Sequence, residues 1–253
     1  MIILEIIRLI LVITNQQLVH LQIDRSIYAC SFKHKMIVKI KFKSQNTFWY
    51  IYKMEKSYGK AERTRNFIIE KTADIFNRKG YAGTSLNDLT EATGLTKGSI
   101  YGNFENKEEV ALAAFDYNLG QVNLIIQQKI NKSDNYYNKL LASARVYDQF
   151  TKSAFPKGGC PILNTAIEAD DTHELLKARA TKAILGWKKN LQDLMQAGVD
   201  AGEFKKDFDH AQLALSIIAL IEGGVMIAKL TNSQSSLDKI VMTIEGLIND
   251  IRR

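Results

Sequence analysis

Hydrophobic residues recur at helical spacing from about residue 60 to the end of the chain. Between residues 60 and 79, Ile68 and Phe76 belong to an apolar face that alternates with charged positions, as in an amphipathic helix. Gly80 ends this pattern and Tyr81 follows it, the usual glycine-then-hydrophobe ending of a helix. We therefore expect a helix over residues 60–79.

Two shorter helices are predicted next, separated by a tight turn. Either Thr84 or Ser85 can cap the first of them, which buries apolar residues such as Leu89. Gly94 provides the turn, where a positive φ costs little only for glycine, and Thr96 can cap the second helix. Two short helices joined by such a turn form a helix-turn-helix, whose second helix enters the DNA major groove.

The pattern in the rest of the chain predicts long helices and no strand. Their expected ranges are 106–130, 136–153, 161–169, 173–201, 208–230 and 236–252. The last of them carries a sustained apolar stripe, and the one before it is apolar with a Gly223–Gly224 pair that allows close backbone approach. We expect an all-α protein, in which these two helices serve either a plain core or a dimer interface.

Residues 1–53 differ from the rest and hold most of the positive charge. They contain eight Lys and Arg residues against two acidic residues, so the net charge of +7 says little about the helical part. The opening "MIILEIIRLILVIT" is short for a membrane span, and "IVKIKFKSQNTFWYIY" alternates like a strand without an obvious later partner. We interpret residues 1–53 as an extension outside the working domain; a poorly ordered tail and a membrane-surface anchor are the alternatives.

The candidate chemistry gives no sign of an enzyme. Two cysteines, Cys30 and Cys160, cannot form a disulfide framework of the secreted kind, which favours a reducing compartment. No nucleophile–base pair, phosphate loop or metal cluster is recognisable, and His173 and His210 stand at expected helix starts rather than at ligand spacing. We predict no catalytic residue, no metal and no cofactor.

Residues 63–115 resemble the DNA-binding head of the TetR family of bacterial transcription regulators. The resemblance is carried by Ala73, Phe76, Gly80, Tyr81, Thr84, Ser85, Gly94, Leu95, Thr96, Gly98, Ser99, Ile100, Tyr101, Phe104, Lys107, Glu108 and Val110. One departure is Asn103, where the family often has His or Tyr. The resemblance implies a three-helix head over residues 54–106 and a helical effector-binding and dimerisation domain over 107–253.

The recognition helix is expected to hold its apolar residues inward and its polar ones toward DNA. Ile100 and Phe104 anchor it, while Ser99 and Asn103 are candidates for base contacts and Lys107 for a phosphate contact. The resemblance adds that Thr84 touches a phosphate. The complete set of expected DNA-binding residues is Thr84, Ser85, Thr96, Lys97, Gly98, Ser99, Tyr101, Asn103 and Lys107.

The second domain contains one unusual stretch, "AFPKGGCPILNTAIEADD". Cys160 precedes Pro161 at an expected helix N-terminus, a setting that can lower a thiol pKa and make the thiol reactive. The plain alternative is a small buried residue that packs a turn. The candidate effector pocket comprises Tyr147, Phe150, Phe155, Cys160, Trp187 and Met226.

Together these patterns predict a cytoplasmic, ligand-responsive transcriptional regulator. We expect a homodimeric repressor that binds a palindromic operator in double-stranded DNA and is released by a small, largely apolar effector, without a membrane partner. The alternatives are a repressor that senses oxidants or electrophiles through Cys160 and, third, a helical protein anchored to a membrane surface.

Overall fold

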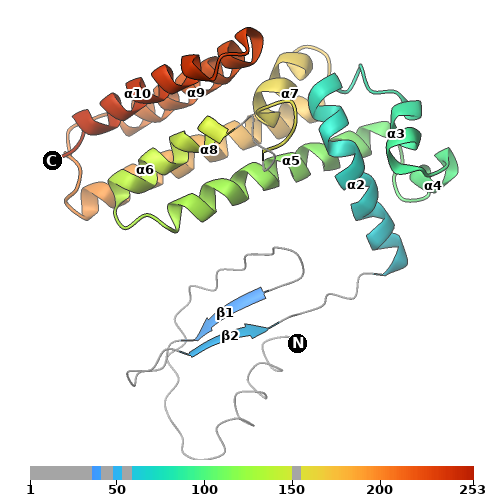
Figure 1. Cartoon of the computed structure of the whole chain (residues 1–253), viewed down its shortest axis with the longest axis horizontal. Coiled ribbons are helices and arrows are strands. Elements are labelled where there is room, and N and C mark those ends of the chain that lie inside the picture. Colours follow the sequence, from blue (N-terminus) through green and yellow to red (C-terminus); the bar gives the residue numbers. More distant parts are fainter. Residues whose placement is uncertain (1–35, 41–47, 53–58, 150–154) are drawn as a thin grey trace, which may run out of the picture. The chain divides into compact units, whose positions relative to one another are not determined.

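The computed structural model describes residues 36–40, 48–52, 59–149 and 155–253. The chain divides into two compact units, Met1–Tyr58 and Gly59–Arg253 (Figure 1). The hypotheses about the apolar opening of the chain, including the membrane-surface anchor, concern residues outside the described part. The expected domain boundaries at residues 53 and 106 stay predictions.

The described residues of the first unit form a β-hairpin. Strand β1 (Met36–Ile40) pairs with strand β2 (Phe48–Tyr52) in an antiparallel register that places Val38 opposite Tyr50. The segment that alternates like a strand thus supplies both strands, which pair with each other rather than with a later part of the chain. The all-α prediction applies to the second unit, where it is confirmed.

The second unit begins with three helices that form a small head. They are α2 (Lys60–Lys79), α3 (Leu86–Thr93) and α4 (Lys97–Tyr101). Ser85, not Thr84, caps α3: its hydroxyl accepts the Asp88 N–H, and the Asp88 carboxylate accepts the Ser85 N–H. Gly94 then takes the left-handed conformation, with φ 66°, that the turn requires. The predicted helix-turn-helix is present.

A larger helical receiver, which we define as residues 107–253, follows the head. Its elements are α5 (Lys107–Ile130), α6 (Tyr136–Arg145), the 3₁₀ helix η1 (Val146–Gln149), α7 (Pro161–Ala169), α8 (Glu174–Asp200), α9 (His210–Thr231) and α10 (Gln234–Asp250). The helix expected over 136–153 is thus shorter than predicted, because α6 ends at Arg145 and passes into η1.

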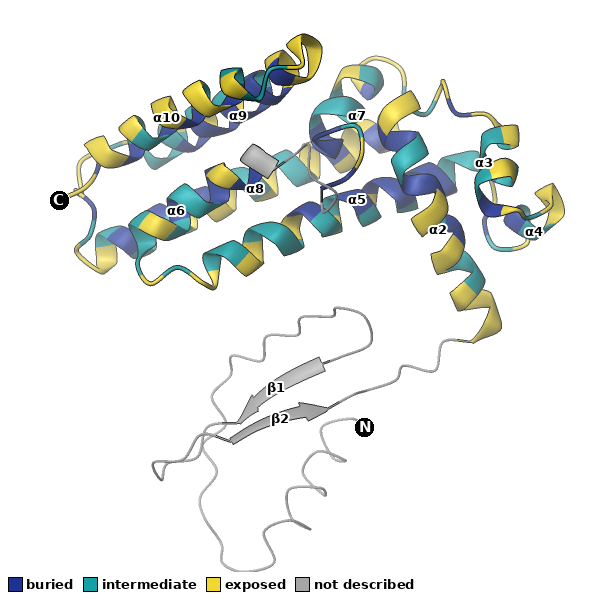
Figure 2. Ribbon diagram, viewed as in Figure 1, coloured by how far each residue is buried: buried dark blue, intermediate teal, exposed yellow. Residues whose placement is uncertain are grey.

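Helices α9 and α10 run side by side and pack closely at one point (Figure 1). A Cβ atom on Gly224 would lie 2.8 Å from Leu237 Cδ1, so the glycine permits this approach, whereas a Cβ on Gly223 would meet nothing within 4 Å. The opposite face of the pair is exposed (Figure 2). Its exposed large hydrophobic residues are Leu215, Met226, Ile227, Leu230 and Met242.

Helix α9 is also long and apolar enough to cross a membrane, judged by length and composition alone. Of its most apolar window, 44% is buried inside the protein. Buried residues of α9 such as Ile217 and Ile221 belong to the receiver core together with Ile244 of α10. Those contacts are the ones that the central helix of a folded domain makes.

Candidate DNA interface and receiver core

Helix α4 presents a short polar surface on a firm apolar base. Ile100 and Phe104 are buried, with 0% and 2% of their surface exposed, and they belong to the core of the head. Thr96 caps the helix by accepting the Ser99 N–H at 3.2 Å. Lys97 is exposed on the outer side of this base. The predicted division between anchoring and DNA-facing residues is thus physically possible for α4.

The remaining α4 candidates lie near the same surface. Tyr101 and Ser99 are half-buried, Gly98 is exposed, and the Lys97 ammonium lies 6.0 Å from the centre of the Tyr101 ring. The side-chain nitrogen of Asn103 donates to the Ser99 carbonyl at 2.9 Å. One N–H of the Asn103 side chain is therefore used in a hydrogen bond at the end of the helix. The role of Asn103 in DNA contact stays a prediction.

Arg65 of α2 braces this platform, a role that the pattern of residues did not indicate. Its guanidinium lies 4.0 Å from the centre of the Phe104 ring, donates to the Asn103 carbonyl, and pairs with Glu109 at 2.6 Å. Hydrogen bonds from the Glu105 N–H and from Arg65 hold the pKa of Glu109 below its usual range. The recognition helix is thereby fixed to both α2 and α5.

Two of the expected DNA contacts serve the fold in this structure. Thr84 is 1% exposed and its hydroxyl donates to the Gly80 carbonyl at 2.6 Å. The expectation that Thr84 touches a phosphate does not fit, because the residue is buried. Lys107 is half-buried; its ammonium donates to the Tyr81 and Thr84 carbonyls at 2.8 and 2.9 Å and lies over the Tyr81 ring. The lysine thus secures the turn that precedes α3.

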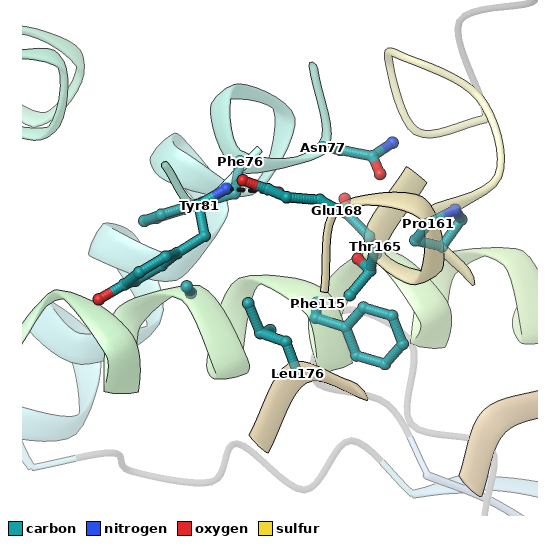
Figure 3. Close-up of a pocket in the computed structure, with 10 residues that line it drawn as sticks. Phe76, Asn77, Tyr81, Phe115, Pro161, Thr165, Glu168 and Leu176 are labelled. Atoms are coloured by element: carbon teal, nitrogen blue, oxygen red, sulfur yellow. Dashed lines mark hydrogen bonds between the residues drawn. The ribbon is translucent and has the colours of Figure 1, made fainter. Parts of the chain in front are cut away.

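Helix α7 of the receiver contacts the head directly. One Glu168 oxygen accepts the Tyr81 N–H at 2.8 Å (Figure 3). The other accepts the Ala82 N–H at 2.7 Å. Gly80 has φ 72°, and a Cβ atom there would lie 2.3 Å from Glu168 Oε2. Glycine at this position therefore permits both the end of α2 and the approach of the carboxylate.

A second set of hydrogen bonds strengthens the same junction. The buried Asn77 side chain of α2 donates to the Lys157 and Gly159 carbonyls, and Asn164 of α7 donates to the Asn77 carbonyl at 3.0 Å. The recess that these elements enclose (Figure 3) has a volume of about 20 Å³. That is room for a water molecule but not for an organic effector.

The receiver core gathers three of the expected pocket residues into one aromatic cluster. Tyr147 stacks on Trp187 with ring centres 5.4 Å apart and meets Phe155 edge-on at 5.6 Å. Phe150 lies outside the described residues. Met226 does not fit the prediction, because its side chain is 43% exposed on the outer face of α9 and lies outside this core.

Cys160 lies against the cluster but is not the activated thiol that its helix-start position suggested. It is 1% exposed, and its Sγ donates to Glu222 Oε1 at 2.9 Å. Burial, then the Glu222 carboxyl, raises the pKa of the Cys160 thiol well above its usual range, outweighing the N–H groups of Ile162 and Leu163. The hypothesis of a lowered thiol pKa is therefore wrong, and the plain alternative of a small buried residue agrees with the structure.

Glu222 is the polar residue that the sequence reasoning missed. It is 9% exposed on α9, and burial raises the pKa of its carboxyl to about 7. A lone glutamate inside the apolar run "IALIEGGVMI" was the available signal. Among the described residues, no group of three or more His, Cys, Asp and Glu side chains is arranged to hold a metal ion.

Two family models match the chain, one in each part of the second unit. Residues 68–114 match the bacterial regulatory proteins of the tetR family, and residues 137–244 match the tetracyclin repressor-like C-terminal domain. The first range contains the helix-turn-helix and the second covers most of the receiver. The two models follow each other in the order expected from the sequence.

Known regulators resemble the chain over nearly their whole length. The HTH-type transcriptional repressor DhaR of Mycobacterium sp. (strain GP1) is 25% identical over 71% of this chain and 89% of its own. The uncharacterized HTH-type transcriptional regulator YxaF of Bacillus subtilis (strain 168) is 30% identical over 73% of this chain and 95% of its own.

A solved structure agrees with them. A TetR-family transcriptional regulator from Cytophaga hutchinsonii is 51% identical, with a TM-score of 0.74 over 78% of this chain and 98% of its own. The helix-turn-helix, the receiver and these similarities lead to one conclusion: the chain belongs to the TetR family of DNA-binding transcription regulators.

Proposed function

We propose that the protein is a cytoplasmic repressor that binds a palindromic operator as a homodimer and leaves it when a small organic effector enters the receiver. The observation that carries the proposal is the braced platform of α4, with Lys97 exposed above buried Ile100 and Phe104. A positioned cation of this kind suits contact with phosphates or with guanine edges in the major groove.

Exposed large hydrophobic side chains on α9 and α10 support the dimer. Leu230 and Met242 are 76% and 67% exposed, and such a set of large hydrophobic side chains on adjacent helices is typical of an interface. A two-fold dimer would present two heads to two half-sites, so operator symmetry would follow protein symmetry.

Helix α7 supports a route from effector to DNA. Its first turn touches the receiver core through Cys160, and Glu168 near its other end holds the Tyr81 and Ala82 N–H groups of the head. An effector that displaces α7 would bias the head toward an arrangement unable to bind DNA. By linkage, DNA would weaken effector binding by the same factor.

The test measures binding of the full chain to DNA from upstream of its own gene. We expect a dimer to bind a palindrome there, and Lys97→Ala to weaken binding by about 10-fold, in line with the loss of a charged contact. Lys206→Ala, at an exposed position in the loop before α9, is the matched control and should bind like the parent. Equal affinity of Lys97→Ala and parent for the palindrome would contradict the assignment of α4.

A further inference from the structure

The carboxyl of Glu222 is only half satisfied. Oε1 accepts the Cys160 thiol at 2.9 Å, whereas Oε2 is fully buried and accepts no hydrogen bond from any described residue. An unpaired buried acceptor is costly, and more so when it carries charge. A ligand that donated a hydrogen bond to Oε2 would therefore stabilise the folded protein.

The protein does not supply that donor from its nearby basic residues. Lys229 lies on α9 two turns after Glu222, and its ammonium donates instead to the Gly158 carbonyl at 2.6 Å and to Asn164 Oδ1 at 3.3 Å. No ion pair within the described ranges includes Glu222. Glu222 is thus a buried acid without a basic partner in the described receiver.

Aromatic rings share the receiver core with Cys160, the hydrogen-bond partner of this acid. Tyr147 is close enough to Cys160 and Glu222 that both raise its pKa, in addition to the larger effect of burial. Trp187 stacks on Tyr147, and Phe155 meets the same ring edge-on. The faces of aromatic rings attract cations, most strongly where water is excluded. A carboxylate beside such rings complements an organic cation.

We propose that the effector is a small organic ammonium compound that donates an N–H to Glu222 Oε2 and places its apolar body among Tyr147, Phe155 and Trp187. This inference rests on the proposed function and names its ligand class. A neutral apolar compound would leave Oε2 unpaired, and an anion would be repelled by the carboxylate. Tyr147 and Phe155 are buried in this structure, so the ligand selects an arrangement in which the rings have parted.

The same site can reach the head without a further element. Glu222 holds Cys160 at the start of α7 through Oε1, so a ligand that enters beside this carboxyl and parts the neighbouring side chains also moves the start of α7. Helix α7 spans only nine residues, Pro161–Ala169, and Glu168 near its end holds the head. Displacement of the first turn of α7 therefore bears directly on the two hydrogen bonds to Tyr81 and Ala82.

The first experiment compares three probes of nearly equal size on the parent protein. Titration calorimetry at pH 8 uses 4-phenylbutylammonium, 4-phenyl-1-butanol and 4-phenylbutanoate. The pKa of about 7 leaves Glu222 mostly ionised at this pH. We expect the ammonium to bind about 10- to 100-fold more tightly than the alcohol, as a charged hydrogen bond implies, and the anion to bind most weakly. Equal binding of ammonium and alcohol, or binding of none of the three, would overturn the proposal.

The second experiment removes the charge and keeps the shape. Glu222→Gln should bind ammonium and alcohol within about 3-fold of each other, whereas Glu70→Gln, at an exposed position on α2, should keep the parental ratio. Thermal melting of each variant establishes that it is folded. A folded Glu222→Gln protein that keeps the parental ratio contradicts the assignment, and the parental ranking decides the matter if this variant does not fold.

DNA binding separates this inference from the function on which it rests. If the parent binds the palindrome but does not distinguish the probes, the ammonium site is wrong and the repressor proposal stands. If the parent binds ammonium but no palindrome, the repressor proposal fails while the site remains. If both occur, 4-phenylbutylammonium should lower operator affinity by about 5- to 150-fold in the parent, and by less in Glu222→Gln.

Discussion

The head and the receiver treat their polar groups in opposite ways. At the head, Arg65 pairs with Glu109 at the start of α5 and Ser85 pairs with Asp88, and both pairs lie near the surface. In the receiver, Glu222 is buried with one oxygen unpaired. The head is thereby held in one arrangement before it meets DNA, which lowers the ordering cost of binding. The receiver keeps an unmet interaction, which a ligand can satisfy. The head thus provides a rigid surface for DNA binding, and the receiver provides a core that can respond to a ligand.

Removal of the buried ring beneath the recognition helix should destabilise the head more than any other change considered below. Phe104→Ala deletes a buried ring and the contact that positions the Arg65 guanidinium. We expect a loss of about 3–5 kcal/mol in the free energy of unfolding, as for other buried aromatic residues. Urea denaturation measures this loss. Phe67→Ala removes a ring that is 39% exposed and should cost much less; equal losses would show that α4 does not depend on this base.

Because Glu222 is buried without a partner for Oε2, the stability of the receiver should depend on pH. The folded-state pKa of Glu222 is raised from 4.5 to about 7, so the folded state binds a proton that the unfolded state releases. Stability from this residue is present below pH 4.5 and is lost as the pH rises through 7, by about 3 kcal/mol in all. Glu222→Gln should remove this decline.

Denaturation curves at several pH values between 4.5 and 8 measure the effect. The informative quantity is the difference between parent and Glu222→Gln, because other titrating groups are common to both. Glu70→Gln should leave the decline unchanged, since Glu70 is exposed. If the stabilities of parent and Glu222→Gln change with pH in the same way, a residue other than Glu222 causes the decline.

Loss of the Glu168 hydrogen bonds, which link α7 of the receiver to the head, should have the smallest effect on stability of the three changes. Glu168→Ala leaves the Tyr81 and Ala82 N–H groups without their acceptor. We expect a loss of about 1–3 kcal/mol in stability and a smaller effect of effector on operator affinity. Fluorescence anisotropy on labelled operator, with and without effector, measures the coupling. Glu174→Ala, at the exposed start of α8, should keep it; full coupling in Glu168→Ala would exclude this route.

How well the sequence predicted each region depends on the range of the forces involved. The caps at Ser85 and Thr96 and the turn at Gly94 act between residues two to four apart, so the local pattern was enough to predict the helix-turn-helix. Thr84 and Lys107 belong to the same motif. Lys107 of α5 donates to the Tyr81 and Thr84 carbonyls, which lie 26 and 23 residues earlier, and spacing along the chain does not show that contact. The Thr84 hydroxyl bonds to Gly80 only four residues away, but its burial depends on the folded head.

The receiver was predicted less well for the same reason. Cys160 and Glu222 are 62 residues apart in the chain, and only the folded structure shows that the carboxyl and burial oppose ionisation of the thiol. The helix-start position alone predicted the opposite direction. Met226 fell on an apolar helix, as expected of a pocket residue, but α9 has two apolar sides and this residue lies on the outer one.

The ring stack of Tyr147 and Trp187 makes the receiver core visible to spectroscopy. Indole emission changes in wavelength and intensity when a neighbouring ring moves or a charge approaches. The chain has two tryptophans, and the other, Trp49, lies in strand β2 of the first unit. A Trp49→Phe protein would therefore emit from the receiver alone. The fluorescence of Trp187, whose ring centre lies 5.4 Å from that of Tyr147, would then report the opening of the core in real time.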